Sequence, residues 1–514
     1  MKSITVIFLL CSISVFSNAQ LISTFELGSM TADAQLPLSN SASVAARERG
    51  TLWFGTARGL TRTTDDGASW THYASAQTFD DKGISAIAVR GDTIWVAIGY
   101  SERRDGSTIQ IGGGLHFSTN RGTTWTYVKQ PMDTGTVDTL VYGINKIRAL
   151  AVTVPEQNLT FDIAMTRNTV WIASFGGMFR KSTDQGKTWQ RVILPPDGSR
   201  DRISPTDTLS FDLSPSSGRL GLQENLNHIA FSAYASDDST IWVGTSGGIN
   251  KSTDGGISWR KFTAQNQSRP ISGNWVVAIN EQRLKGKRII WAATVNARDA
   301  SERQGVSFSS DGGESWTTTL LGERAHNIEF RDSVVYVATN NGLFRSVDLG
   351  KAWIRTGSIT DVTTRQRFAS PTIYAAATKG DTLWISGSEG IAYTIDHPAT
   401  PFGSTWKIFR TYEPVGSSSR TYAFPTPFSP DDEVVRIHYS TADKTVPVTI
   451  RIFDFAMIPT RTLIQNATRI GSIEHDEIWD GRDDFNRRVA NGVYFYRIDI
   501  ESTESIWGKI HVVQ

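Results

Sequence analysis

Residues 240–259 read TIWVGTSGGINKSTDGGISW. Apolar and polar residues alternate along two short runs joined at Gly-Gly, which is the pattern of a β-hairpin with one buried face. A second tight turn follows at STDGGISW, where the Asp side chain can accept backbone N–H groups and Gly can adopt a positive φ. Another apolar run, residues 228–233, comes before the stretch. The whole unit therefore predicts four short antiparallel strands.

The same unit recurs along the chain. Clear copies occupy residues 51–70, 169–189 and 334–353, and looser copies open at Trp95, Trp291 and Trp384. All seven units close with Trp, six open with Trp, and the other opens with Tyr336. Because radial closure leaves only short strand edges exposed, seven four-stranded units predict an all-β fold with a seven-bladed β-propeller, which we place at residues 41–412.

The repeat also carries a family resemblance. The turn S/T-x-D-x-G-x-T/S-W behind a W-x-A/G-T-x-x-G-L/I strand pair resembles the Asp-box repeat, also called the bacterial neuraminidase repeat, over residues 51–406. That family includes sialidases, some endoglucanases and many non-enzymatic secreted propellers. The resemblance implies that the Asp boxes are structural and lie on the rim away from the active face. The turn residues concerned are Asp65, Asn120, Asp184, Asp254, Asp311, Asp348 and Asp396.

The start of the chain has the pattern of a secretory signal peptide at residues 1–19, followed by an N-terminal segment at 20–40. Lys2 begins it, a short apolar run follows, and Ser-Asn-Ala forms the cleavage site. The only cysteine, Cys11, lies inside the apolar run, so the secreted chain is expected to hold no disulfide and no thiolate site. No later run reaches 18 consecutive apolar residues, which predicts no transmembrane helix.

The end of the chain predicts a second domain. Residues 413–423 form a linker, and alternating apolar residues in 424–514 predict a β-sandwich. Three motifs, FPTPFSP at 424–430, WDGRD at 479–483 and NGVYFYR at 491–497, resemble the immunoglobulin-like domain of the flagellar hook-capping protein. A similar domain serves as the sorting domain of type IX secretion. The resemblance implies the type IX machinery as a partner and a secreted or surface location in a Gram-negative-type bacterium.

Charge and composition exclude several function classes. Lys plus Arg number 52 and Asp plus Glu 51, a net charge of +1. No overall basic field is therefore available to hold a nucleic acid, and we expect no nucleic-acid partner. The sequence also predicts no cofactor and no metal site.

The longest loops indicate where a site could be. In a propeller the loops between blades and those between second and third strands open on one face, opposite the Asp-box turns, and the longest insertions fall mainly there. Arg clusters suit carboxylates and planar polar groups, although solvated surface charge is an alternative interpretation. The candidate binding residues are Arg103, Arg104, Asp201, Arg202, His228, Trp275, Arg298, Asp299, Arg303 and His326.

Three functions remain open. The first is a secreted or surface-attached, non-enzymatic protein that recognises an extracellular protein or glycan through the loop-rich face. The second is a sialidase-like glycoside hydrolase, but the Arg-Ile-Pro motif usual before the first blade is absent, since residues 45–49 read AARER. The third is a structural component of the envelope or matrix. No catalytic residue is assigned.

Overall fold

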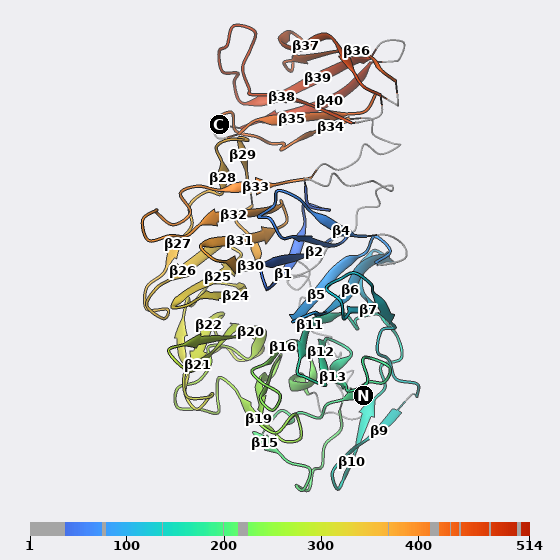
Figure 1. Cartoon of the computed structure of the whole chain (residues 1–514), viewed down its shortest axis with the longest axis vertical. Helices are drawn as coiled ribbons and strands as arrows, with labels where there is room; N and C mark the ends of the chain where they lie inside the picture. Colours follow the sequence, from blue (N-terminus) through green and yellow to red (C-terminus); the bar gives the residue numbers. More distant parts are fainter. Residues whose placement is uncertain are drawn as a thin grey trace, which may run out of the picture.

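The structure is a computed structural model that describes residues 36–513, apart from 75–78, 136, 199, 214–224, 369, 412–420, 432, 442–443, 472–473 and 501–504. The predicted signal peptide therefore lies outside the described residues, as do most of the N-terminal segment and of the linker. Within the described ranges there is no α-helix, and the helical structure is one short 3-10 helix, η2 (Leu226–His228). A ring of small sheets and a second β-domain make up the molecule (Figure 1).

Seven antiparallel sheets form the ring, and the strands of each follow one another along the chain. Blade 1 contains β1 (Ala42–Glu48), β2 (Thr51–Thr56), β3 (Gly59–Thr63) and β4 (Thr71–Tyr73). Blade 2 contains β5 (Gly83–Arg90), β6 (Thr93–Arg104), β7 (Ser107–Ser118) and β8 (Thr126–Val128). Blade 3 contains β11 (Thr160–Met165), β12 (Val170–Ser174), β13 (Met178–Ser182) and β14 (Gln190–Arg191). Blade 4 contains β16 (Ala230–Ala235), β17 (Ile241–Thr245), β18 (Gly248–Ser252) and β19 (Trp259–Phe262), with β15 (Arg202–Ile203) as a fifth strand on β19.

The remaining blades repeat the same order. Blade 5 contains β20 (Trp275–Leu284), β21 (Lys287–Val295), β22 (Gly305–Ser309) and β23 (Thr317–Thr319). Blade 6 contains β24 (Ala325–Arg331), β25 (Val334–Thr339), β26 (Gly342–Ser346) and β27 (Ile354–Arg355). Blade 7 contains β30 (Ile373–Lys379), β31 (Thr382–Gly387), β32 (Ile391–Ile395) and β33 (Lys407–Phe409). Two hairpins stand between blades, namely β9 (Val137–Tyr142) with β10 (Asn145–Leu150), and β28 (Thr360–Asp361) with β29 (Gln366–Arg367).

Six of the seven predicted turns are closed by their own side chains. In blade 4 the Asp254 carboxylate accepts the N–H of Ser258 (2.9 Å) and its hydroxyl (2.5 Å), while the hydroxyl of Ser252 accepts the N–H of Gly256 (2.8 Å). Burial raises the pKa of Asp254, and these hydrogen bonds lower it by more, so the net shift is downward. Corresponding bonds hold the turns at Asp65, Asn120, Asp184, Asp311 and Asp348.

The turn joins its blade to the preceding one, and we call this contact the aromatic clamp. At three junctions the closing Trp of one blade meets the opening Trp of the previous blade edge to face, as in Trp189 with Trp95, where the ring centroids are 6.4 Å apart at 90°. Gly256 in the turn of blade 4 has a φ of +83, and a Cβ on this residue would come within 2.5 Å of Trp171 in blade 3. Glycine is therefore required by close approach as well as by backbone conformation.

Blade 7 departs from this pattern. The predicted turn role of Asp396 is corrected by the structure, because this carboxylate is buried and reaches across to blade 6. It accepts hydrogen bonds from the Tyr336 hydroxyl, from Arg345 Nε (2.7 Å) and from Arg331 Nη2 (3.2 Å). Blade 6 is the blade that opens with Tyr instead of Trp, and a buried phenol needs an acceptor. The irregular seventh turn therefore supplies the partner that Tyr336 requires.

The ring closes between blades 7 and 1 through side chains, without a shared strand. Asn40 donates from Nδ2 to the Thr411 carbonyl (3.0 Å), and the Thr411 N–H donates to Asn40 Oδ1 (2.8 Å). Lys379 of β30 pairs with Asp66 at 2.8 Å. Apolar residues of both blades, including Phe54, Trp70 and Trp384, form one buried cluster across this junction.

The C-terminal domain is a β-sandwich of two sheets. One sheet contains β34 (Thr421–Phe424), β35 (Val435–Tyr439) and β38 (His475–Trp479), and the other contains β37 (Pro459–Arg469), β36 (Val446–Phe453), β39 (Gly492–Ile500) and β40 (Ile506–Val512). Their facing side chains form a core around Trp479, which is fully buried and donates from Nε1 to the Arg482 carbonyl (2.9 Å). The predicted fold class, an all-β chain with a seven-bladed propeller and a C-terminal sandwich, is confirmed.

The sandwich touches the propeller through the β28–β29 hairpin. The Arg436 side chain donates to the Thr364 carbonyl (3.2 Å), and the Val434 N–H lies 3.4 Å from the Arg365 carbonyl (Figure 1). β34 begins at Thr421, within the range predicted for the linker.

The Asp-box bonds predict a graded effect on stability. Replacing Asp254 with Ala removes the acceptor of the Ser258 N–H and hydroxyl, and the free energy of unfolding should fall by about 1–2 kcal/mol. Asp348 is the matched comparison, because Ala352 stands where blade 4 has Ser258, so Asp348→Ala should cost less. Urea denaturation of both variants measures the difference. Equal losses would contradict the assignment of the hydroxyl bond.

Candidate functional site

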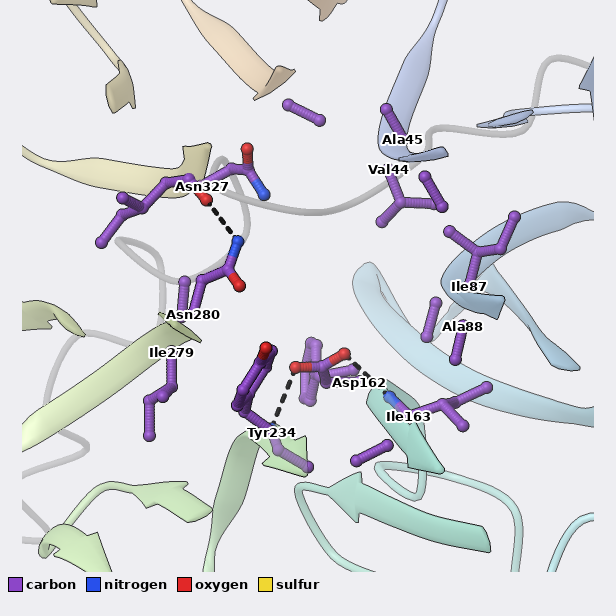
Figure 2. A pocket seen from close by; sticks show the side chains of 18 of the residues that line it. Val44, Ala45, Ile87, Ala88, Asp162, Ile163, Tyr234, Ile279, Asn280 and Asn327 are labelled. Atoms are coloured by element: carbon purple, nitrogen blue, oxygen red, sulfur yellow. Dashed lines mark hydrogen bonds between the residues drawn. The ribbon is translucent and has the colours of Figure 1, made fainter. Parts of the chain in front are cut away.

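The first strands of the seven blades surround a central cavity of about 530 Å³. Its wall includes residues of β1, β5, β11, β16, β20, β24 and β30 (Figure 2). Because the innermost strand of a blade has no further strand beside it, its free edge and its inward side chains determine what the channel can bind.

Every innermost strand is bulged near its start. In β16, for example, Ala230 pairs with Thr245 and Ser232 with Gly244, so Phe231 is skipped. A bulge re-aims the extra side chain and is frequent beside binding sites. The seven skipped residues are Ser43, Ser85, Phe161, Phe231, Val277, His326 and Tyr374, and all but Ser85 line the cavity. The bulges thus form a ring at one end of the channel, which we call the channel mouth.

Aromatic side chains gather on one arc of the channel mouth. The ring centroids of Phe161 and Phe231 are 5.1 Å apart, those of Phe231 and Trp275 5.3 Å, and those of His326 and Tyr374 5.7 Å. Phe161 and Tyr374 are half-buried, whereas Phe231 and Trp275 are only 5% and 8% exposed. The arc offers an apolar, concave wall with small exposed faces.

One cation stands at this arc. Arg324, immediately before β24, holds its guanidinium 5.5 Å from the ring centre of Trp275. His326 is buried beside it, with Nε2 2.6 Å from Asn340 Oδ1. Burial, with a contribution from Arg324, lowers the pKa of His326 to about 4, so this imidazole is neutral at physiological pH.

Most polar side chains of the channel wall tie one blade to the next. Asp162 in blade 3 accepts the Ala233 N–H of blade 4 (2.9 Å). Asn280 in blade 5 donates to the Ile328 carbonyl of blade 6 (2.8 Å), and Asn327 in blade 6 accepts the Ala376 N–H of blade 7 (3.1 Å) (Figure 2). These side chains satisfy backbone groups on free strand edges, which otherwise would be unpaired away from bulk water.

Two carboxyl groups of these inner strands have strongly raised pKa values. Burial raises the pKa of Asp162 to about 7, against the lowering effect of the N–H groups of Ala233 and Ile163. Burial also raises the pKa of Glu329 to about 7, against hydrogen bonds from the hydroxyl (2.8 Å) and N–H (3.2 Å) of Thr378. Both groups bond to the following blade, so they link strands as well as titrating near neutrality.

The structure brings half of the predicted binding residues together. Trp275 and His326 lie at the channel mouth, and the loop between β21 and β22 carries the exposed side chains of Arg298, Asp299 and Arg303 nearby. Asp299 caps its own loop by accepting the N–H (2.8 Å) and hydroxyl (2.7 Å) of Ser301. The binding role of these five residues stays a prediction.

The other five lie elsewhere. Arg103 and Arg104 are at the tip of the long β6–β7 hairpin, where Arg104 pairs with Glu102 (2.6 Å) and Glu156 (2.9 Å). Arg202 belongs to β15 on the outer edge of blade 4, and Asp201 directly precedes it. Their place in a binding surface on the loop-rich face stays a prediction. His228 is fully buried in η2 and accepts the Leu194 N–H at 3.2 Å. Burial lowers the pKa of His228 to about 3. His228 is thus a core residue and not part of the channel mouth.

Sequence reasoning missed the bulged aromatics and Arg324. Phe161, Phe231 and Tyr374 stand near the start of apolar runs, where a regular strand would place them in the core. An extra apolar residue at the same point of several repeats was the available signal. Arg324 had no motif of its own.

Two searches of the described residues gave negative findings. Within those ranges, no group of three or more His, Cys, Asp or Glu residues has the arrangement of a metal site. In the same part of the chain, no helix has the length and apolarity needed to cross a bilayer.

Comparison with known proteins gives distant matches. No protein-family model matches the chain. The xyloglucanase Xgh74A of Acetivibrio thermocellus is 21% identical over 249 residues, which are 43% of this chain and 26% of that enzyme. The match thus spans about a quarter of the length of this curated relative.

Solved structures resemble the fold at low identity. The GH74 enzyme of Niastella koreensis is 13% identical with a TM-score of 0.49, covering 94% of this chain and 74% of that one. PorZ, described as an essential surface component of the type IX secretion system of Porphyromonas gingivalis, is 13% identical with a TM-score of 0.40, covering 92% and 66%. YCF48 from Cyanidioschyzon merolae is 18% identical with a TM-score of 0.42, covering 71% and 98%. At these identities the likeness concerns the fold alone.

The raised pKa of Glu329 predicts a pH-dependent stability. The folded carboxyl keeps its proton up to about pH 7, whereas the unfolded one loses it near pH 4, so the folded state binds more protons between these values. The free energy of unfolding should therefore fall as pH rises through this window. Glu329→Gln keeps an oxygen for Thr378 and should flatten that fall by about 2 kcal/mol between pH 5 and 8, measured by urea denaturation.

Glu314→Gln is the matched control. A hydrogen bond from Arg260 lowers the pKa of Glu314, so its removal should leave the slope in this window unchanged. An unaltered slope in Glu329→Gln would show that Glu329 is ionised in the folded protein.

Proposed function

We propose that the protein is a secreted or surface-attached binding protein without enzymatic activity, and that it recognises an extracellular protein or glycan at the channel mouth. The ring of bulges carries this proposal. It turns Phe161, Phe231, His326 and Tyr374 toward the cavity at one end of the channel, and together with Trp275 they form a concave apolar wall with a few polar groups. Such a composition is typical of ligand sites.

The bonding of the channel carboxyls supports binding over catalysis. Asp162 and Glu329 each accept hydrogen bonds from the following blade, so each helps to hold neighbouring strands together. Glu302, in the loop beside Trp275, accepts the N–H groups of Asn274 (2.9 Å) and Ala297 (2.7 Å). A general acid or nucleophile needs a carboxyl directed at the substrate, whereas these carboxyls are directed at backbone.

A second candidate is a glycoside hydrolase, which the alignment with xyloglucanase Xgh74A favours. This reading places a β-glucan, rather than a sialoside, in the channel mouth. It requires two carboxyls roughly 5–9.5 Å apart on either side of the scissile bond. Incubation of the purified protein with xyloglucan and with sialosides, followed by a reducing-sugar or free-sialate assay, separates the two candidates. We expect no product from either substrate, and turnover would overturn the non-enzymatic proposal.

The C-terminal sandwich has a separate role in this proposal. Its three motifs resemble a sorting domain, and its own apolar core around Trp479 supports independent folding. We assign it to export or anchoring through the type IX machinery.

The channel-mouth variants test the binding proposal. A ligand for the full-length secreted chain is first selected on a glycan and peptide array. Phe161→Ala and Tyr374→Ala should then each weaken its affinity about tenfold, because both remove apolar contact at the mouth. Val362→Ala is the control, since this apolar side chain is 78% exposed on the β28–β29 hairpin. Unchanged affinity in both aromatic variants, with retained thermal stability, would place recognition elsewhere.

The location proposal has its own test. Deleting residues 421–514 should leave a folded propeller that binds the selected ligand but accumulates in the periplasm of the native host. Cell fractionation with immunodetection measures this. A truncated protein that still reaches the surface or the medium would show that the sandwich is not a sorting domain.

A further inference from the structure

Arg324 differs from three well-buried arginines in what it faces. Arg180 and Arg191 pair with Asp133 (3.0 and 2.5 Å), and Arg410 pairs with Glu389 (3.1 Å). Arg324 is half-buried, and among the residues that the structure describes no carboxylate lies within ion-pair distance of it. Its guanidinium lies over the ring of Trp275, 5.5 Å from the ring centre.

The surroundings of Arg324 do not neutralise it. His326 is uncharged at neutral pH, for the reason given above, and its Nε2 is engaged with Asn340. The Glu302 carboxylate is occupied by the backbone of residues 274 and 297. Arg303 and Asp299, both exposed on the same loop, carry opposite charges. The guanidinium of Arg324 is therefore a partly desolvated cation with no carboxylate partner among the described residues.

A carboxylate is the group that complements such a site. A partly desolvated guanidinium loses hydration, and a ligand carboxylate restores the lost interaction with two parallel charge-assisted hydrogen bonds. The contact with the Trp275 ring and the partial burial restrict the Arg324 side chain, so less side-chain entropy is lost on binding than for an exposed Arg.

The residues that line the cavity near Arg324 indicate which group could accompany the carboxylate of the ligand. Phe161, Phe231 and Val277 line it with apolar surface. Phe231 and Trp275 are almost completely covered, so neither offers an open ring face on which a pyranose could stack. A ligand with a carboxylate and an apolar side chain on the same carbon atom fits this arrangement, and the C-terminal residue of a peptide has this chemistry.

We propose that Arg324, held over Trp275, binds the terminal carboxylate of a peptide whose last residue is apolar, and that the last side chain enters the cavity beside the half-buried ring of Phe161. This deepens the proposed function and rests on it, since it places the ligand in the same channel mouth.

The test uses the full-length secreted chain and two small probes. N-acetyl-leucine and N-acetyl-leucine amide differ only in the charged carboxylate. In saturation-transfer NMR titrations the carboxylate form should bind, and the amide should bind at least about tenfold more weakly. Arg324→Gln should abolish that difference, and Arg324→Lys should retain part of it because the charge remains. Arg355→Gln is the matched control, since Arg355 is exposed on the outermost strand of the same blade.

Each alternative outcome has a distinct meaning. Equal binding of both probes would overturn the carboxylate site, as would an Arg324→Gln variant that is folded by circular dichroism and retains the preference. Binding of glucuronate in place of N-acetyl-leucine would overturn the peptide assignment. If the carboxylate preference fails while Phe161→Ala and Tyr374→Ala still weaken the array ligand, the proposed function survives without this site. If those variants have no effect either, both proposals fail.

Discussion

The aromatic clamp is the interaction on which the whole propeller depends. A blade of four short strands cannot bury both of its faces, so each one must be covered by a neighbour. The opening Trp of one blade and the closing Trp of the next provide that cover, and aromatic pairs of this kind contribute about 0.5–1.5 kcal/mol beyond the area they bury. The Asp-box turn fixes where the closing Trp lies, and its glycine allows the turn to approach the ring. Repetition of this contact sets the orientation of the blades around the channel.

The candidate site consists of side chains that do not join one blade to the next. Inner strands have free edges, and Asp162, Asn280 and Asn327 satisfy them from the preceding blade. These polar side chains are therefore committed to the ring, although they face the cavity. The bulges have the opposite effect, because each one releases a side chain from the strand ladder at the mouth. Binding chemistry is thus concentrated at one end of the channel, where the bulged aromatics and Arg324 meet.

The fold could be predicted because its determinants are local and repeated. The spacing between opening and closing aromatics, the turn residues and the alternation of apolar side chains all lie within 20 or so residues of each other and agree. The partnership of Tyr336 with Asp396 could not be found this way, because 60 residues separate them and the signal is a departure from the repeat.

The candidate site was predicted less well, for reasons of geometry. Trp275 and His326 were found because they begin inner strands. His228 was misplaced because a 3-10 turn carries it into the core before β16 begins. The extra strand that carries Arg202 to the outer edge of blade 4 has no signal in the sequence pattern. A bulge shifts a side chain by one position in the strand. The alternation of apolar and polar residues in the sequence does not reveal a shift of one residue. An arginine can bind a ligand carboxylate when no carboxylate of the chain already pairs with it. Such pairs form between residues that lie far apart in the sequence, so the local pattern does not reveal them.

The side-chain junction between Asn40 and Thr411 has a mechanical consequence. Thr411 is at the end of blade 7 that leads toward the sandwich, and Asn40 stands just before blade 1. If the sandwich is held at a surface, tension from a bound partner enters the propeller at β33, which leads to Thr411, and at the β28–β29 hairpin. Two hydrogen bonds and the apolar cluster behind them are then loaded together with the Lys379–Asp66 pair. The ring would resist as a closed hoop, and its first point of failure under load would be this junction, while the clamps between the other blades stay intact.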